Sequence, residues 1–598
     1  MCSRTTTSCL AAVAAALVAL GAAEPRPATG RRVVLISFDA GADWIVDTLI
    51  ARGAAPAFAA VARDGAQAEA MVSVMPSLTA VAHASLWTGA FPRVHGATDN
   101  YMPKMPAARH TLLERQSGYL STVLRAEPIW EAAGRQGRRA LVIQASQGYP
   151  FTSRHPSRVR QFDIYANELL PSALVTGHVG TDGLGFEIGD TAARFRRGAG
   201  GELRLEVGGA ATTLSASEFS PPMPVEAGGL KGHTRVGLLE YDRTSGRILA
   251  LRGDVVRLMA TDPAARDALM AEAGVTVGEV GSRYYAAGQF GLTLADGGTG
   301  SAERHLVDVT VANQRYFDGA LRYAARESWD LLVLYVPSMD VAGHALVGML
   351  DPDTPGHDPA LAARIWPVYE EIFRRCMDGH VAAIRRLMPD ATLVIGADHG
   401  VEGFRRWWYP NAVLREAGLL AETAGGTVDL ARTRAVFLYS HGGGVHVNSS
   451  RRKGGIVADA DHASVKALAR AALLAARDPD TGTPLVRATF DTAEQGEALG
   501  VGGDAAPDLY PDPAPGYYAS GRFGSRVIVG PAVPRGMGGH GAPPTRRRLQ
   551  GIFYAAGPGV RAGARPGTVR QVDVAPTVAH LLGIGPPAQS VGTALAIE

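Results

Sequence analysis

Six carboxylate and imidazole side chains stand where they could bind metal ions. They are Asp39, Asp340, His344, Asp398, His399 and His540. Aspartate and histidine together suit Zn²⁺, or another borderline divalent ion, better than Mg²⁺ or Ca²⁺, which prefer ligand shells made of oxygen alone. Six ligands divide into two sites of three, and each site keeps positions open for a substrate and a nucleophile.

A candidate nucleophile lies between Met75 and Gly89, where hydroxyl residues precede a helix-like stretch. Ser77 or Thr79 could cap this helix by accepting a hydrogen bond from a backbone N–H. The same helix N-terminus could instead receive an anionic group, while a metal ion lowers the pKa of the hydroxyl so that it attacks. The residues alone leave both roles open and do not choose between Ser77 and Thr79.

Three apolar segments precede the aspartates. Residues 33–38, 330–337 and 391–397 are continuous apolar runs, typical of strands buried on both faces of a parallel sheet. Residues 359–387 have the apolar spacing of a helix. In open α/β sheets ligands bind beyond the carboxyl ends of the strands, which is where the aspartates stand. We therefore predict an α/β fold with a doubly wound, mostly parallel sheet.

Two stretches depart from this pattern. Residues 149–300 are rich in glycine and contain short alternating runs, so we predict a β-rich insertion there. Residues 424–534 are irregular and hold a proline-rich tract, so we predict a second, smaller insertion. Residues 24–148, 301–423 and 535–598 remain as the catalytic core.

The N-terminus has the pattern of an export signal. Arg4 precedes an apolar run from Leu10 to Leu20, which is too short to span a bilayer and is followed by small residues. We predict cleavage after Ala23, so that residues 1–23 form a signal peptide. The mature protein is then expected in the periplasm or outside a bacterial cell, and no later segment is expected to cross a membrane.

Composition indicates a globular protein. Hydrophobic residues make up 46% of the chain and charged residues 19%. The 59 basic and 57 acidic residues nearly balance, and no basic stripe with interleaved aromatic residues occurs. A nucleic-acid polymer is therefore not an expected partner. The oligomeric state stays unknown from the sequence.

Motifs that resemble those of one known family run through most of the predicted core. They are residues 36–39, 76–83, 88–100, 330–344, 398–400, 540, 553–558 and 572–583. Together they resemble the type I phosphodiesterase/nucleotide pyrophosphatase family of the alkaline phosphatase superfamily, which implies an alkaline-phosphatase-like core. One departure lies at residues 80–82, where Ala-Val-Ala replaces the Phe-Pro-Asn that is frequent in the family. That departure bears on the shape of the pocket and not on the metal ligands.

The resemblance implies a role for each site residue. Thr79 would be the nucleophile, and Asn100 would hydrogen-bond a phosphoryl oxygen. The ligands would divide into one Zn²⁺ site of Asp39, Asp398 and His399 and a second Zn²⁺ site of Asp340, His344 and His540. The implied reaction is hydrolysis of a small-molecule phosphodiester through a phosphothreonine intermediate.

Other functions differ from this one by particular residues. A sulfatase would resemble its relatives in a Cys/Ser-x-Pro-x-Arg motif, which residues 77–81 lack. A threonine-type phosphomonoesterase resembles this chain but adds a Lys-x-Arg pair in the insertion; no lysine lies between Lys104 and Lys231, although Arg158 and Arg160 could substitute. A non-catalytic binding protein is disfavoured because the nucleophile and all six ligand candidates are present.

Several further residues have two interpretations. Residues 407–409 (Trp-Trp-Tyr) could line a substrate pocket, although an aromatic cluster is more often part of a core. His441 and His446 flank glycines in a predicted loop and could lie at the surface or beside the site. His83 and His95 belong to the family motifs without being ligands, and we predict structural roles for both.

Overall fold

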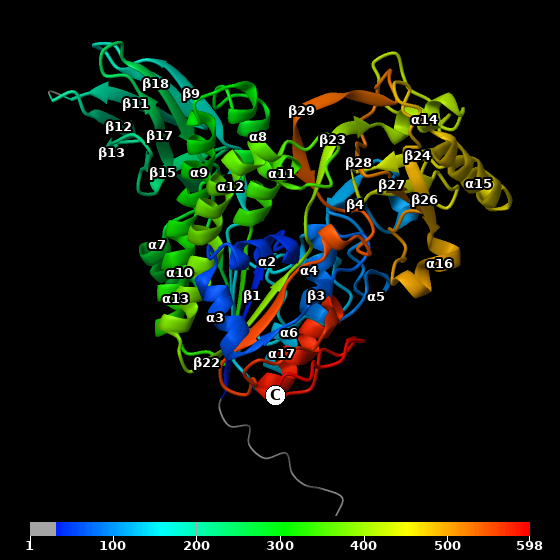
Figure 1. Cartoon of the computed structure of the whole chain (residues 1–598), viewed down its shortest axis with the longest axis horizontal. Coiled ribbons are helices and arrows are strands. Elements are labelled where there is room, and N and C mark those ends of the chain that lie inside the picture. Colours follow the sequence, from blue (N-terminus) through cyan, green and yellow to red (C-terminus); the bar gives the residue numbers. More distant parts are fainter. Residues whose placement is uncertain (1–30, 199, 440) are drawn as a thin grey trace, which may run out of the picture.

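A computed structural model describes residues 31–198, 200–439 and 441–598. The predicted signal peptide, residues 1–23, lies outside the described residues. Among the described residues no single helix is long and apolar enough to cross a bilayer, but α2 (Asp43–Ala51) and α3 (Pro56–Asp64), bent by 100°, pass that test as a pair. A layered α/β core occupies one half of the molecule, and two further lobes stand above it on opposite sides (Figure 1).

The core contains an eight-stranded sheet in the order β2-β30-β22-β1-β21-β6-β7-β20. The parallel strands are β22 (Ala391–Ala397), β1 (Arg32–Phe38), β21 (Leu331–Val336), β6 (Ala140–Ile143) and β7 (Val159–Asp163). The antiparallel edge strands are β30 (Phe553–Ala556), β2 (Ala66–Gln67) and β20 (Met259–Ala260). Every residue of β21 and β22 is buried, as expected of central strands covered on both faces.

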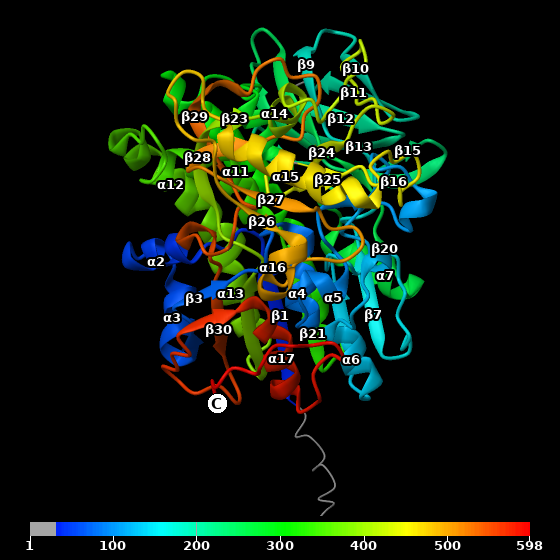
Figure 2. The same ribbon diagram turned by 90° about the vertical axis from the view of Figure 1, so that its right-hand side faces the viewer.

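Helices cover both faces of this sheet, which confirms the predicted fold class (Figures 1 and 2). One face carries α4 (Thr79–Thr88), α5 (Pro92–His95), α6 (Ile129–Arg135) and α17 (Val574–Leu582). The other carries α2, α3, α9 (Ser301–Ala312), α10 (Gln314–Arg326), α11 (Ser338–Leu350), α12 (Pro359–Phe373) and α13 (Gly379–Leu387). The helix predicted over residues 359–387 is confirmed, with a π-helical segment, Arg374–Asp378, joining α12 to α13.

The first lobe is built from three four-stranded sheets whose pairs are antiparallel. Its strands are β8 (Glu168–Leu170), β9 (Ala173–His178), β10 (Leu184–Ile188), β11 (Thr191–Arg197), β12 (Leu203–Val207), β13 (Ala210–Leu214), β14 (Glu218–Phe219), β15 (Met223–Ala227), β16 (Leu230–Thr234), β17 (Val236–Tyr241), β18 (Arg247–Arg252) and β19 (Val255–Val256). Helices α7 (Pro263–Ala273) and α8 (Gly281–Ala286) follow them. The predicted start of this insertion at residue 149 is corrected, because β7 pairs with β6 inside the central sheet.

The second lobe has its own apolar core around a sheet in the order β24-β25-β27-β26. Its elements are α14 (Pro410–Glu416), β24 (Ala435–Leu438), β25 (Gly444–Val447), α15 (Asp459–Ala475), β26 (Val486–Asp491), α16 (Thr492–Leu499) and β27 (Leu509–Pro513). Strand β23 (Glu402–Trp408) joins it to the core by pairing with β28 (Gly516–Ala519) and β29 (Val529–Gly539). Since β29 runs through residue 535, the chain returns to the core along a strand and not at a loop boundary.

Two small sheets complete the described fold. Strand β3 (Ala70–Val72) pairs in parallel with β31 (Thr568–Arg570). Strand β4 (Tyr101–Pro103) pairs with β5 (Arg115–Ser117). The second of these pairs follows Asn100 directly, and so it fixes the chain beside the carboxyl ends of the central strands.

Candidate active site

The register of the central strands brings two aspartates together. Phe38 of β1 pairs with Ala397 of β22, so Asp39 and Asp398 leave the sheet at the same level. Asp398 Oδ1 accepts hydrogen bonds from the backbone N–H groups of Ala40 at 3.0 Å and His399 at 2.8 Å. Both aspartates are almost fully buried. Parallel pairing therefore sets two carboxylates side by side at the edge where such sheets bind ligands.

Thr79 is the hydroxyl residue that faces this cluster. It is the first residue of α4, and its Oγ1 lies 3.3 Å from His399 Nε2. Ser77 is occupied elsewhere, since its Oγ donates to the Ala542 carbonyl at 2.8 Å and accepts from Gly541 N–H at 3.0 Å. Of the two candidates that the sequence left open, Thr79 is the one whose hydroxyl faces the cluster.

The three histidines predicted as ligands are each held in one orientation. The Nδ1 atom of His344 lies 2.8 Å from the Gly538 carbonyl oxygen. The Nδ1 atoms of His399 and His540 lie 3.0 Å from the carbonyls of Gly400 and Ser77. A carbonyl only accepts, so each Nδ1 must carry the proton. Each Nε2 is then left to bind a metal ion, which is the arrangement that backbone acceptors commonly impose on ligand histidines.

The ligand atoms of all six residues converge. His399 Nε2 lies 3.1 Å from Asp398 Oδ2 and 3.6 Å from Asp39 Oδ1. Asp340 Oδ2 lies 3.3 Å from His344 Nε2, and Asp340 Oδ1 lies 3.5 Å from His540 Nε2. Atoms of Asp39, Asp398 and His399 lie within 4.8 Å of one another, and so do those of Asp340, His399 and His540. His399 thus stands between the two predicted triads, and His344 reaches the second of them through Asp340.

The donor set fits divalent metal ions. One oxygen each of Asp39, Asp340 and Asp398 is buried without a hydrogen-bond partner among the described residues. Burial, with the charges of Asp398 and Asp340, raises the pKa of Asp39 well above its usual range, and burial raises the pKa of Asp398 to about 7. Carboxylates packed this closely repel one another, and a bound cation would offset that repulsion.

The pKa values of the three histidines are shifted in different directions. Burial lowers the pKa values of His399 and His540 below the ordinary value. Burial alone would also lower the pKa of His344, but the adjacent Asp340 carboxylate raises it to about 9. Two neutral imidazoles and one that is protonated near neutral pH therefore face the carboxylates. A metal ion entering the Asp340 side must displace the His344 proton.

Asn100 is fixed beside Thr79. Its Oδ1 accepts from the backbone N–H of Ala80 at 2.9 Å, in the first turn of α4. Its Nδ2 donates to the hydroxyl of Tyr439 at 2.9 Å. The side chain is 5% exposed and lines the same cavity as Thr79. An amide N–H held in this way is placed to contact an oxygen of a group bound at Thr79.

These residues surround a cavity of about 180 Å³. Its lining is Asp39, Leu78, Thr79, Asn100, Tyr119, Tyr165, Glu279, Asp340, His344, Tyr439, Tyr518 and His540. No lysine or arginine is among these described lining residues. Tyr119, Tyr165, Glu279, Tyr439 and Tyr518 were not foreseen from the sequence. Of these, Tyr165 is the one that the sequence could have indicated, because it closely follows β7 in the central sheet. The predicted insertion boundary at residue 149 placed that strand outside the core.

A model of the type I phosphodiesterase/nucleotide pyrophosphatase family matches residues 33–187 and 273–542. The chain belongs to this family. It is therefore a hydrolase that acts on phosphoester bonds, and metal dependence is a property of the family. The unmatched interval between the two segments falls inside the first lobe. The two segments that match the family thus lie on either side of an interval within the first lobe.

Solved structures similar to this phosphodiesterase-family chain include human and murine ectonucleotide pyrophosphatase/phosphodiesterase 5. Each is 14% identical, with a TM-score of 0.45, and the match covers 93% of this chain and 96% of that chain. An inactive threonine-to-alanine variant of the murine protein in complex with AMP matches with the same values. No curated protein sequence matches the chain.

Arg158 and Arg160, which could have replaced the Lys-x-Arg pair of a phosphomonoesterase, lie away from the site. Arg158 precedes β7 and donates to the Gly137 carbonyl at 2.8 Å. Arg160, near the start of β7, pairs with Glu327 at 2.7 Å. The cavity opens beyond the other end of this strand, where Tyr165 lies. Neither arginine is placed to bind a phosphoryl group at Thr79.

The remaining sequence candidates fall into two groups. His441 is buried, its ring stacks on Tyr518 with centroids 4.2 Å apart, and so it supports one wall of the cavity. Trp407 contacts the same tyrosine edge-on at 5.1 Å, whereas Trp408 is part of the second lobe's core. His446 lies within β25 and does not line the cavity.

His83 and His95 are both enclosed in the core. His83 Nδ1 lies 3.0 Å from the Thr79 carbonyl, and its Nε2 lies 2.8 Å from Ser37 Oγ. His95 Nε2 lies 2.9 Å from Ser85 Oγ. Burial lowers the pKa of each to about 3, which keeps both rings neutral. His83 positions the first turn of α4 and with it the Thr79 side chain.

Proposed function

We propose that this protein hydrolyses small-molecule phosphodiesters with two zinc ions and with Thr79 as its nucleophile. The observation that carries the proposal is the Thr79 hydroxyl, which lies 3.3 Å from His399 Nε2 at the edge of a six-ligand cluster. Family membership supports phosphoester hydrolysis in general. The mixed carboxylate and imidazole donors favour zinc over magnesium or calcium.

The six candidate ligands divide into two sets of three. Asp39, Asp398 and His399 would hold the ion next to Thr79, and Asp340, His344 and His540 would hold the other. When bound, the two ions supply Lewis-acid charge that favours the alkoxide form of Thr79 and offsets the negative charge of the phosphoryl oxygens. Burial of the cluster strengthens these electrostatic terms because little water screens them.

The protein's own groups then account for two displacements. Thr79 Oγ, having lost its proton, forms a bond to phosphorus while the bond from phosphorus to one ester oxygen breaks, and the alcohol leaves with a proton. Water next attacks the phosphothreonine, which restores the Thr79 hydroxyl and releases the phosphomonoester. The Asn100 amide N–H would hydrogen-bond a phosphoryl oxygen in both displacements.

The charge of the cavity wall favours a diester over a monoester. A phosphodiester carries one negative charge, whereas a monoester carries nearly two at neutral pH. The described lining holds no lysine or arginine to balance the second charge, and it includes the carboxyl group of Glu279. The two arginines considered as cationic substitutes, Arg158 and Arg160, lie at the opposite end of β7. A threonine-type phosphomonoesterase is therefore the less favoured candidate.

We also propose that the protein is exported to the periplasm or secreted. The support is the N-terminal sequence, in which Arg4 precedes the apolar run from Leu10 to Leu20 and small residues follow. N-terminal sequencing of the protein recovered from a bacterial periplasmic fraction would check this, with a new terminus near Glu24 as the expected result.

Side-by-side hydrolysis of bis-p-nitrophenyl phosphate and p-nitrophenyl phosphate tests the proposed function. We expect the diester to be preferred, and we expect turnover to be lost in Thr79→Ala and after treatment with a chelator. Zinc should restore the wild-type rate, and metal analysis should find about two equivalents. A preference for the monoester would assign the protein to the phosphomonoesterases instead. Activity that survives the loss of Thr79 would exclude the mechanism altogether.

A further inference from the structure

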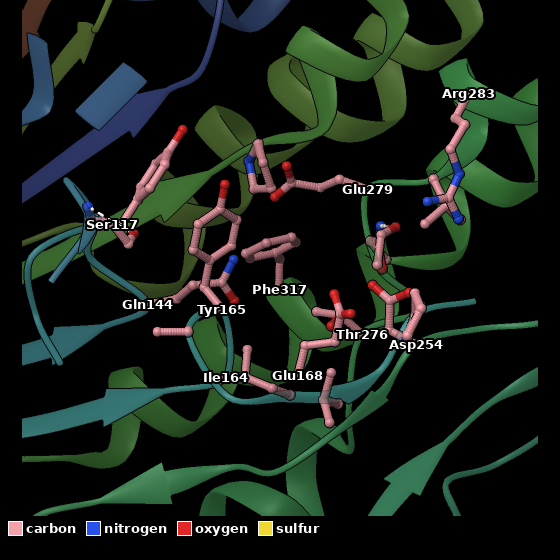
Figure 3. A pocket seen from close by; sticks show the side chains of 18 of the residues that line it. Ser117, Gln144, Ile164, Tyr165, Glu168, Asp254, Thr276, Glu279, Arg283 and Phe317 are labelled. Carbon is pink, nitrogen blue, oxygen red and sulfur yellow. Dashed lines mark hydrogen bonds between the residues drawn. The ribbon is translucent and has the colours of Figure 1, made fainter. Parts of the chain in front are cut away.

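A second, larger cavity adjoins the metal site. Its volume is about 600 Å³, and it shares Tyr119, Tyr165 and Glu279 with the cavity around Thr79. Its other walls come from the end of β6, from the first lobe and from the segment before α8 (Figure 3). A phosphodiester bound at Thr79 has two ester substituents. The three shared residues place this cavity where it could receive one of them.

Glu279 stands at the junction of the two cavities without a counter-charge. Its Oε1 atom is buried and has no hydrogen-bond partner among the described residues. Burial, followed by the charges of Asp39, Asp340, Asp254 and Asp398, raises its pKa well above the usual range. Figure 3 shows its side chain extending into the cavity from the wall formed before α8. A carboxyl group in this position is best satisfied by a positively charged hydrogen-bond donor.

Gln144 is an independent sign of a ligand in the same cavity. It follows β6, is 2% exposed, and its Oε1 has no hydrogen-bond partner in the described part of the chain. Its backbone adopts a left-handed conformation with φ of 54°, which is unfavourable for a residue other than glycine. Figure 3 shows the side chain directed into the cavity. An unpaired amide buried here calls for a partner with its own polar hydrogens.

The lining of this cavity also holds acidic and aromatic side chains. Glu168, Asp254 and Glu279 line the cavity, and the single cationic lining residue among those described is Arg283. That guanidinium is already engaged, because it donates to Ser172 Oγ at 3.0 Å and to the Tyr284 hydroxyl at 3.3 Å. Tyr165 and Phe317 add aromatic surface, which also attracts organic cations.

We propose that this cavity binds an ester substituent carrying a protonated primary amine. Glu279 pairs with the ammonium group, and Gln144 Oε1 accepts one of its N–H bonds. The proposal rests on the proposed phosphodiesterase function and names the class of diester that the enzyme selects. A primary amine fits better than a quaternary ammonium ion, because the two unpaired oxygens require donors as well as charge.

Three chromogenic diesters with a common p-nitrophenyl group separate charge from hydrogen bonding. They are p-nitrophenyl aminoethyl phosphate, p-nitrophenyl trimethylammonioethyl phosphate and p-nitrophenyl propyl phosphate. We expect kcat/KM to fall in that order, with the aminoethyl ester about 10- to 100-fold above the propyl ester. The proposal is overturned if the propyl ester is hydrolysed equally well, or if the trimethylammonio ester equals or exceeds the aminoethyl ester.

Two variants assign the preference to residues. Glu279→Gln should bring the ratio of aminoethyl to propyl kcat/KM close to one, and Gln144→Leu should lower that ratio by a smaller factor. Glu187→Gln, which removes an exposed carboxylate from β10 of the same lobe, should leave the ratio unchanged. Glu279→Gln should also retain its zinc. Loss of metal from this variant, or an unchanged ratio in it, would refute the assignment.

A binding experiment keeps this proposal separate from the proposed function. Thr79→Ala protein loaded with zinc is titrated calorimetrically with phenyl aminoethyl phosphate and with phenyl propyl phosphate. Tighter binding of the amine, abolished by adding Glu279→Gln, would support the cavity assignment even if the wild type proved to be no diesterase. Equal binding of the two esters, alongside Thr79-dependent hydrolysis of bis-p-nitrophenyl phosphate, would leave the function standing and exclude the amine.

Discussion

The cavity around Thr79 has two walls of different construction. One wall consists of residues that leave the central sheet at strand ends or begin the helices next to it, such as Asp39, Thr79 and Asp340. The facing wall, with Tyr165 and Glu279, comes from the segments that lead into and out of the first lobe. The first wall is set by parallel strand pairing, and the second by how a separate β-rich lobe packs on the core.

This difference suggests a division of labour. Strand ends in a buried parallel sheet are rigid, so they suit groups that must hold metal ions and a nucleophile within a fraction of an ångström. Segments of an insertion can change without disturbing the sheet, so they suit groups that select substrates. We expect variants of the first wall to impair the chemistry, and variants of Glu279 in the second wall to change selectivity.

Loss of the nucleophile should have the largest effect. Thr79→Ala is expected to lower kcat for bis-p-nitrophenyl phosphate by about a thousandfold or more, because it removes the hydroxyl that lies 3.3 Å from His399 Nε2. Ser77→Ala is the matched control two residues away. It should lower the melting temperature, since it leaves the Ala542 carbonyl and the Gly541 N–H unpaired, but keep kcat within about tenfold. The reverse pattern would identify Ser77 as the nucleophile.

Zinc affinity of the metal-free protein should depend steeply on pH. The pKa of His344 is raised to about 9, so at lower pH a zinc ion must displace its proton. The apparent affinity should therefore rise with pH up to about 9, by roughly tenfold per unit. Below about pH 7 the slope should steepen, because the pKa of Asp398 is raised to about 7. Competition with a chromogenic chelator measures this, and a flat profile would contradict the ligand assignment.

Removal of the Asn100 amide, the proposed phosphoryl contact, should have an intermediate effect. Asn100→Ala is expected to lower kcat about 10- to 100-fold, because it removes one positioned donor and the contact with Tyr439. Tyr439→Phe, which keeps the ring and removes only the partner hydroxyl, should cost less than about tenfold. If the two variants were equally impaired, the amide would act through Tyr439 and not on the substrate.

The smallest effect is expected at the far end of β7. Arg158→Ala and Arg160→Ala should leave the ratio of diester to monoester hydrolysis unchanged, since both side chains point away from the cavity. Arg160→Ala should lower the free energy of unfolding by at most about 1 kcal/mol, because its ion pair with Glu327 is partly exposed. A lowered monoester rate in either variant would reopen the phosphomonoesterase alternative.

The residues of the wall formed at strand ends could be predicted from the sequence. Those of the facing wall could be predicted only in part. Asp39 and Asp398 could be found because each directly follows a continuous apolar run, and such runs reveal buried parallel strands. Strand β7 was assigned to the insertion because residues 149–300 were interpreted as one glycine-rich stretch with short alternating runs, whereas β7 pairs with β6 in the central sheet. Glu279 carried no signal at all, since it lies in an irregular segment between α7 and α8.

The sequence by itself determined three central strands of the sheet, the six ligand candidates and the presence of hydroxyl residues around the start of α4. Local apolar periodicity encodes these features, and each can be read within a few neighbouring residues. Only the tertiary structure decided that Thr79 and not Ser77 faces the cluster, and that Gln144 and Glu279 line one cavity. Those choices depend on contacts between segments more than a hundred residues apart, which are fixed by packing and not by local preference.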